Sequence, residues 1–132
     1  MLNKIDANEA PTVNGDGTQA YDFIDVEDVA RSNLSSLESE ATDEFYNIGT
    51  GVHTSIKELC ETILDLKKSK LKVTYKPYDK NDVRRLVQNR IGSTAKATAD
   101  LGFTYNYDLR TGLQGLISWR ETHSSDENKL ID

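Results

Sequence analysis

The chain has 132 residues, of which 36% are hydrophobic and 29% charged, and its net charge is −6. This length suits a single domain with a core of its own, and the scattered lysines and arginines of an acidic chain argue against a nucleic-acid-binding protein. A single cysteine excludes an internal disulfide. No segment has the apolar run of a signal peptide or the roughly 20 apolar residues of a membrane span. We therefore expect a cytoplasmic protein without a membrane partner.

The beginning of the chain predicts a helix end, a turn and a strand. Leu2 and Ile5 lie three residues apart, which indicates the end of a helix over residues 1–10 and a chain that begins inside a helix. The Asn-Gly-Asp-Gly run at residues 14–17 favours a hairpin turn, because these residue types tolerate positive φ. Residues 21–24 are the expected return strand of that hairpin.

A helix and another strand are expected next. Asp25 is placed to cap a helix that extends to about Ser39. Residues at helical spacing give this helix one apolar face, formed by Val26, Val29, Ala30, Asn33, Leu34 and Leu37. Residues 44–48 are expected to form a short strand that ends at the Gly-Thr-Gly turn of residues 49–51.

The middle of the chain carries the clearest helix signal. Ser55 and Glu58 form a capping box, in which each side chain accepts a hydrogen bond from the other residue's backbone N–H. The buried stripe of this helix is expected to contain Ile56, Leu59, Cys60, Ile63 and Leu66. Cys60 is accordingly interpreted as a core residue and not as a nucleophile. A strand follows at residues 71–75 and ends before Pro77.

Two more helices complete the expected fold. Ser93 or Thr94 begins a short helix that ends at Leu101, with Gly102 as a left-handed cap, and Asp108 caps the last helix. These elements predict an α+β fold, with a small sheet of short strands and three to four helices. We expect one domain over residues 1–120 and a polar, disordered tail over residues 121–132.

Few residues indicate a binding or catalytic site by their type and spacing alone. The glycine pairs at 15–17 and 49–51 either present N–H groups to a phosphate or simply form turns. Arg84, Arg85 and Arg90 either bind a diphosphate through their planar guanidinium groups or pair with surface carboxylates. His53 and His123 lack metal-ligand spacing, so no metal site is expected. The chain contains neither a Gly-x-Gly-x-x-Gly dinucleotide fingerprint nor a Tyr-x-x-x-Lys pair.

Four blocks of the sequence, in order, resemble a known family. They are Gly-Asp-Gly-Thr-Gln-Ala-Tyr-Asp-Phe-Ile-Asp-Val-Glu-Asp-Val-Ala at 15–30, Glu-Phe-Tyr-Asn-Ile-Gly-Thr-Gly at 44–51 with Thr-Ser-Ile-Lys-Glu-Leu at 54–59, Arg-Ile-Gly-Ser-Thr-Ala-Lys-Ala at 90–97 with Leu-Gly-Phe at 101–103, and the helix at 113–119. The chain resembles the carboxyl-terminal half of extended short-chain dehydrogenases/reductases, among them UDP-glucose 4-epimerases and other nucleotide-sugar epimerases and dehydratases. The resemblance covers residues 10–120.

The resemblance implies a substrate-binding domain of such an enzyme without its Rossmann half. Residues Thr12, Val13 and Asn14 would line the nucleobase, and Arg84 would contact the diphosphate of a nucleotide-diphosphate sugar. Tyr21 stands where many members carry arginine, and Ser93 replaces a common aspartate, which leaves the particular sugar nucleotide open.

The same resemblance assigns the chemistry to the other half. NAD and the Tyr-x-x-x-Lys pair would lie in the Rossmann half, so this chain is expected to hold no catalytic, cofactor-binding or metal-binding residue and to be inactive alone. The parent reaction would be sugar epimerisation through a transient keto sugar. A nucleotide-sugar dehydratase and a stand-alone, non-catalytic interaction module remain as alternatives.

Overall fold

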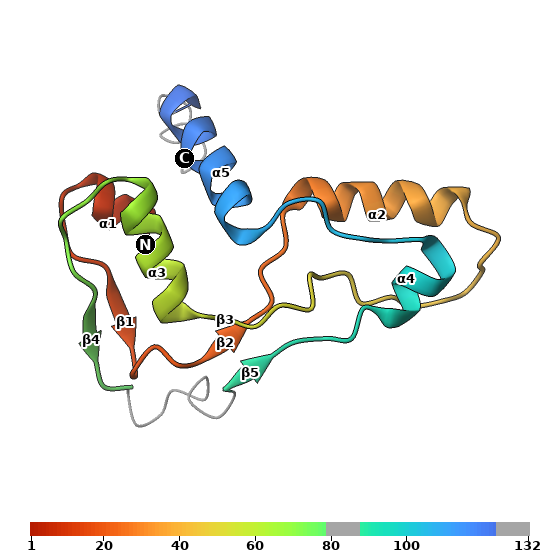
Figure 1. Cartoon of the computed structure of the whole chain (residues 1–132), viewed down its shortest axis with the longest axis horizontal. Coiled ribbons are helices and arrows are strands. Elements are labelled where there is room, and N and C mark those ends of the chain that lie inside the picture. The colour runs from red at the N-terminus through yellow and green to blue at the C-terminus, as the bar shows by residue number, and fades with distance from the viewer. Residues whose placement is uncertain (79–87, 124–132) are drawn as a thin grey trace, which may run out of the picture.

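The computed structural model describes residues 1–78 and 88–123, in which five helices and five short strands follow one another along the chain (Figure 1). The helices are α1 Leu2–Asp6, α2 Val26–Glu38, α3 Ile56–Leu66, α4 Ala95–Leu101 and α5 Leu109–His123. The strands are β1 Thr12–Asn14, β2 Ala20–Tyr21, β3 Thr54–Ser55, β4 Thr74–Lys76 and β5 Asn89–Arg90. The predicted α+β fold of short strands and helices is confirmed, but the strands form two small sheets instead of one and the described residues contain five helices instead of three to four.

The strands form two separate sheets. In the first sheet β1 pairs with β4 in parallel, with Thr12 opposite Thr74. In the second, β2 lies between β3, which is antiparallel to it, and β5, which is parallel to it. The predicted hairpin between β1 and β2 is therefore wrong. The reason is that the turn carries the chain from one sheet to the other, as the backbone N–H of Gly15 still donates to Lys76 of β4.

The largest apolar cluster lies at one end of the molecule. Ile5 of α1 packs with Ile63 and Leu64 of α3, and all three are buried. Partly buried neighbours complete the cluster: Leu2, Leu59, Leu71, Val73 and Leu113. Figure 1 shows α1, α3, β1 and β4 at this end, with α5 beside them and α2 with α4 at the opposite end. Burial of apolar side chains here stabilises the short elements, which are too short to be stable alone.

The predicted helix ends are found where local sequence signals placed them. Ser55 accepts a hydrogen bond from the N–H of Glu58, whose carboxylate accepts one from the N–H of Ser55 at 2.7 Å. Gly102 ends α4 with φ of 62°, a left-handed conformation that glycine adopts without a steric penalty. Cys60 is fully buried, as predicted, and burial raises the pKa of its thiol.

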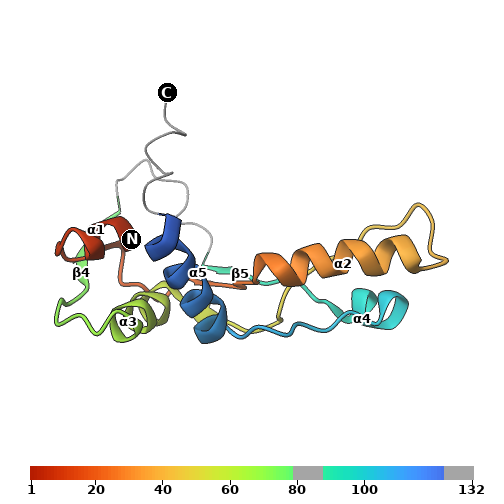
Figure 2. The same ribbon diagram turned by 90° about the horizontal axis from the view of Figure 1, so that it is seen from above.

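Helix α2 differs from an ordinary amphipathic helix. Asp25 caps it as predicted, through a hydrogen bond from the N–H of Glu27. The residues of α2 that the rest of the chain buries are the polar Asp28 and Ser32, whereas the predicted apolar face contains side chains exposed to solvent. Val26 is 77% exposed and Leu37 83%. The helix lies against α4 and the chain that follows it, as Figure 2 also shows.

Three predicted strands differ from the structure. The strand expected at residues 21–24 is β2 Ala20–Tyr21, which ends at Tyr21. Residues 44–48 pair with no strand in the part of the chain that the structure describes, so the predicted strand there is wrong. Residues 71–73 are irregular, and the strand begins only at Thr74, because its partner β1 is three residues long.

Helix α5 extends to His123, and residues 124–132 of the predicted tail lie outside the described residues. Among the helices of residues 1–78 and 88–123, none is long and apolar enough to cross a membrane.

The capping box predicts a measurable contribution to stability. Replacing Ser55 with alanine removes the acceptor for the Glu58 N–H, so the free energy of unfolding should fall by about 1 kcal/mol. Urea denaturation followed by circular dichroism measures this loss. Glu61→Ala, at an exposed position of the same helix, is the control and should change stability by less than about 0.5 kcal/mol. Equal losses in the two variants would show that the cap contributes nothing.

Candidate functional site

The turn between the two sheets uses its own polar groups internally. Asp16 accepts hydrogen bonds from the hydroxyl of Thr18 at 2.7 Å and from its N–H at 3.0 Å. These two bonds lower the pKa of the Asp16 carboxyl. The N–H of Gly15 donates to Lys76. Because two N–H groups of this turn are bonded within the chain and a carboxylate lies beside them, the turn does not form a phosphate cradle.

The residues predicted to contact a nucleobase form strand β1 of the first sheet. The Thr12 hydroxyl is 3.1 Å from that of Thr74 and accepts from Lys4 at 3.2 Å. The side chain of Val13 is buried, and Val13 lies opposite Tyr75 of β4. Asn14 is partly exposed, and its carbonyl accepts from the side chain of Gln19 at 3.0 Å.

The other predicted contact residues do not lie on this strand. Tyr21 belongs to the second sheet, opposite Thr54 and Arg90, and its ring centroid is 6.0 Å from that of Phe23. Arg84 lies outside the described residues. The structure thus brings the three β1 residues together and places Tyr21 in a different sheet.

The second glycine pair encloses a carboxylate of the chain itself. Asp22 accepts hydrogen bonds from the N–H and hydroxyl of Thr50, at 2.9 and 2.6 Å, and from the N–H of Gly51 at 2.8 Å. A side chain at position 49 would overlap the Asp22 carboxylate, which explains the glycine there. The anion-binding geometry considered for residues 49–51 is therefore present, but it holds Asp22.

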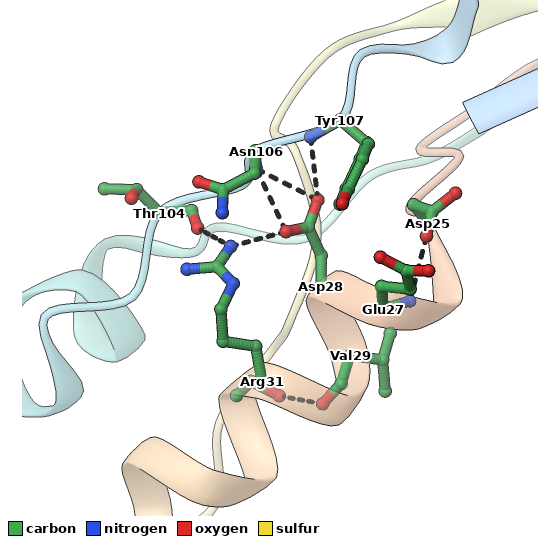
Figure 3. A network of polar contacts seen from close by, with 9 residues as sticks. Asp25, Glu27, Asp28, Val29, Arg31, Thr104, Asn106 and Tyr107 are labelled. Carbon is green, nitrogen blue, oxygen red and sulfur yellow. Dashed lines mark hydrogen bonds and ion pairs between the residues drawn. The ribbon is translucent and has the colours of Figure 1, made fainter. Parts of the chain in front are cut away.

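The most buried charge of the described chain is the carboxylate of Asp28, whose surroundings Figure 3 shows. It accepts hydrogen bonds from the N–H groups of Asn106 and Tyr107, at 3.0 and 3.1 Å, and forms an ion pair with Arg31. The same guanidinium donates to the carbonyl of Thr104 at 2.7 Å. Burial acts to raise the pKa of Asp28, but the bonds from Arg31, Tyr107 and Asn106 together hold it below its usual value. This network joins α2 to the segment between α4 and α5.

Two adjoining hollows lie between the start of α2 and α5. The larger has a volume of about 450 Å³ and the other about 270 Å³, and both contain Val26, Gly112 and Leu116 in their walls. At position 112 a Cβ would come within 2.8 Å of the Asp25 carboxylate, so glycine lets α5 approach the start of α2. No group of three or more histidine, cysteine or acidic side chains within residues 1–78 and 88–123 is arranged to hold a metal ion.

Comparison with known proteins identifies the family. Residues 1–49 match the model of the NAD dependent epimerase/dehydratase family. Over 94% of its length the chain is 30% identical to a protein of Methanocaldococcus jannaschii provisionally described as a UDP-glucose 4-epimerase. The crystal structure of UDP-glucose 4-epimerase from Thermotoga maritima with UDP-glucose has 30% identity and a TM-score of 0.80 over 90% of this chain. The chain is similar to members of this family over most of its own length.

The chain corresponds to a part of each family member. It spans 38% of the Methanocaldococcus protein and 37% of the Thermotoga structure. A GDP-6-deoxy-D-mannose reductase of Pseudomonas aeruginosa is 28% identical over 86% of the chain, which spans 36% of that protein. The fold is that of the carboxyl-terminal part of an extended short-chain dehydrogenase/reductase. Relatives of nearly equal identity thus carry the names of different enzymes, an epimerase and a reductase.

The sequence reasoning missed the structural role of two aspartates. Asp22 and Asp28 lie in the block at 15–30, in which the sequence alone indicated only a helix cap and a favourable charge in the first turn. The available signal was Arg31, three residues after Asp28, a spacing that places the two side chains on one side of a helix. The partners at residues 104–107 are more than 70 positions away, and no local pattern indicates them.

The Asp28 network predicts a large effect of a single substitution. Asp28→Ala leaves two backbone N–H groups and Arg31 without their acceptor, so the free energy of unfolding should fall by about 3 kcal/mol. Urea denaturation at neutral pH measures the loss. Glu38→Ala at the exposed end of the same helix is the control, with an expected change below about 0.5 kcal/mol. A loss of similar size in both variants would contradict the role of the network.

The lowered pKa of Asp28 also predicts a pH dependence. A carboxyl whose folded pKa lies below its unfolded value of about 3.9 stabilises the fold above that value, and this stabilisation is lost as the pH falls through the folded pKa. Stability should therefore decrease from about pH 4 downward, and Asp28→Asn should reduce the steepness of that decrease. Unfolding measured between pH 7 and pH 2 tests this; equal slopes in the two proteins would contradict it.

Proposed function

We propose that this chain is the nucleotide-sugar-binding part of an NAD-dependent nucleotide-sugar epimerase. The observation that carries the proposal is the likeness, at 30% identity and a TM-score of 0.80, to a UDP-glucose 4-epimerase crystallised with UDP-glucose. The relative from Methanocaldococcus jannaschii, described in the same terms, supports the same substrate class. The ligand we propose is a nucleotide-diphosphate sugar.

The free edge of β1 is the proposed contact for the nucleobase. The carbonyl of Pro11 and the N–H of Gly15 both bond to β4, and main-chain groups alternate in direction along a strand. The main-chain groups of Thr12 and Asn14 therefore face away from β4. The carbonyl of Asn14 already accepts a hydrogen bond from Gln19, so the edge offers chiefly the N–H and C=O of Thr12 and the N–H of Asn14. A neighbouring donor and acceptor suit the imide edge of a pyrimidine base. The buried Val13 fixes the strand against the chain from the other side.

Arg84 and Tyr21 are the proposed contacts for the diphosphate. A guanidinium donates two parallel, charge-assisted hydrogen bonds to phosphate oxygens, and this is the role we propose for Arg84. Tyr21 can donate one hydrogen bond, which makes a weaker contact than the arginine found there in many members of the resembled family. The proposal for Arg84 rests on its sequence position alone.

We place NAD and the reaction itself in the other part of the parent protein. The N–H groups of Gly15, Thr18, Thr50 and Gly51 are bonded within the chain, so the two glycine turns offer no cradle for the cofactor's pyrophosphate. The sequence also contains no Tyr-x-x-x-Lys pair. The 132 residues would thus bind and orient a sugar nucleotide without oxidising it. Whether the parent is an epimerase or a dehydratase is then a property of that other part.

The proposal predicts ligand binding without turnover. Isothermal titration calorimetry should show weak binding of UDP-glucose, since part of the contacts of a complete site is missing, and no binding of NAD. Arg84→Ala should weaken UDP-glucose binding at least tenfold, the equivalent of about 1.4 kcal/mol. Arg110→Ala is the control, because Arg110 forms an exposed ion pair with Asp65 and should leave the affinity unchanged.

Two outcomes would contradict the proposal. Tight binding of NAD by the 132-residue chain would place the cofactor site here and not in the other part. Equal UDP-glucose affinity in the Arg84→Ala variant and the unchanged chain would remove Arg84 from the site. An interaction module without chemistry is the alternative, and it predicts no UDP-glucose binding at any concentration tested.

A further inference from the structure

Arg90 differs from the other arginines of the described residues in having no partner for its guanidinium there. Within residues 1–78 and 88–123 the other three form ion pairs with carboxylates: Arg31 with Asp28, Arg110 with Asp65 and Arg120 with Asp6. The side chain of Arg90 is exposed and forms no hydrogen bond or ion pair within these residues. In a chain with a net charge of −6, the described fold thus leaves one guanidinium unpaired.

The register of the second sheet places Arg90 beside Tyr21. Strand β5 is parallel to β2, with Tyr21 opposite Arg90, and Figure 1 shows the two strands next to each other. The N–H of Asp22 donates to the carbonyl of Arg90 at 3.2 Å, and the N–H of Ala20 donates to that of Gln88 at 2.7 Å. Side chains at paired positions project from the same face of a sheet, and neighbouring strands lie about 4.8 Å apart. The guanidinium and the phenol ring therefore extend from one face.

Neither group is neutralised or occupied by its neighbours in the described residues. Tyr21 is partly exposed, and its ring contacts that of Phe23, with centroids 6.0 Å apart. The hydroxyl of Tyr21 forms no hydrogen bond within residues 1–78 and 88–123. The carboxylate of Asp22, the next residue, accepts from the N–H groups of Thr50 and Gly51. Because these neutral donors hold Asp22, it does not neutralise Arg90.

We propose that Arg90 and Tyr21 together bind the diphosphate of the sugar nucleotide, with the charge supplied from β5 and a hydrogen bond from β2. A guanidinium donates two parallel, charge-assisted hydrogen bonds to phosphate oxygens, and a phenol hydroxyl donates one. This inference rests on the proposed function and adds a residue to that site. For Arg90 it decides between the two roles that the sequence left open, a diphosphate contact and a surface ion pair.

The pairing also accounts for the tyrosine at position 21. Many members of the resembled family carry arginine there, so one cation is missing from β2. Position 90 lies at the same register on the adjoining strand, one strand spacing away, and its side chain extends from the same face. The long arginine side chain spans that spacing. The sheet thus keeps one guanidinium on this face, carried by β5 in place of β2.

Calorimetric titration of the 132-residue chain with UDP-glucose tests the contact. Arg90→Ala should weaken binding at least tenfold, because the strand remains but the charge is lost. Arg90→Lys keeps the charge without the planar fork and should lose less affinity than Arg90→Ala. Tyr21→Phe removes one hydrogen bond and should weaken binding about fivefold. Arg110→Ala, which removes an exposed ion pair with Asp65, is the control and should leave the affinity unchanged.

A rescue experiment tests whether positions 21 and 90 serve one phosphate contact. The double variant Tyr21→Arg/Arg90→Ala carries the guanidinium on β2, so its affinity for UDP-glucose should return to within about threefold of the unchanged chain. An affinity as low as that of Arg90→Ala would overturn the proposal, since an arginine at position 21 would then not reach the phosphates that Arg90 contacts.

The titrations also separate this inference from the proposed function. If the unchanged chain binds UDP-glucose and Arg90→Ala binds it equally well, the inference is wrong and the proposed function stands. If the unchanged chain binds no UDP-glucose, both are wrong. Arg90→Ala should weaken UDP as much as UDP-glucose, because the contact is to the diphosphate. A loss confined to UDP-glucose would assign Arg90 to the sugar and overturn the inference.

Thermal unfolding distinguishes a binding role from a structural one. Because the guanidinium has no partner within the described residues, Arg90→Ala should unfold within about 2 °C of the unchanged chain. A decrease of about 10 °C or more would show that Arg90 supports the fold, and the weaker binding of the variant would then not arise from a lost phosphate contact. That result would overturn the assignment.

Discussion

The burial of the Asp28 carboxylate constrains the rest of this structure. A carboxylate removed from water must accept hydrogen bonds or pair with a cation, and Asp28 does both, with the chain at Asn106 and Tyr107 and with Arg31. This requirement fixes α2 against the segment that leads into α5. It also determines which side of α2 faces inward, and therefore why Leu34 and Leu37 face solvent.

The acidic residues of the block at 15–30 act mainly on the chain itself. Asp22 holds the glycine turn at residues 49–51, Asp25 caps α2, and Asp28 holds the connection to α5. In the described structure these three aspartates therefore act as scaffold residues. Asp22 directly follows Tyr21 of β2, so its bonds to Thr50 and Gly51 connect the end of that strand to the turn after residues 44–48.

Sequence reasoning succeeded where the cause is local. The capping box of Ser55, the cap of α2 and the left-handed Gly102 each depend on residues within one helical turn, and the structure confirms them. It failed where the outcome depends on distant partners. The Asn-Gly-Asp-Gly turn has hairpin chemistry, yet β1 found its partner in β4, about 60 residues later. The predicted contacts at Thr12, Val13, Asn14, Tyr21 and Arg84 follow from the family resemblance, and all of them stay predictions.

By itself the sequence determined the family resemblance, the approximate positions of the helices and the presence of an apolar stripe on α2, since these depend on residue order and short-range periodicity. Only the tertiary structure decided which way that stripe faces, that the second glycine turn encloses Asp22, and that β1 and β2 belong to different sheets. The physical reason is that a hydrogen-bond donor or acceptor has several acceptable partners, and the choice between them is made by the long-range packing that brings particular segments together.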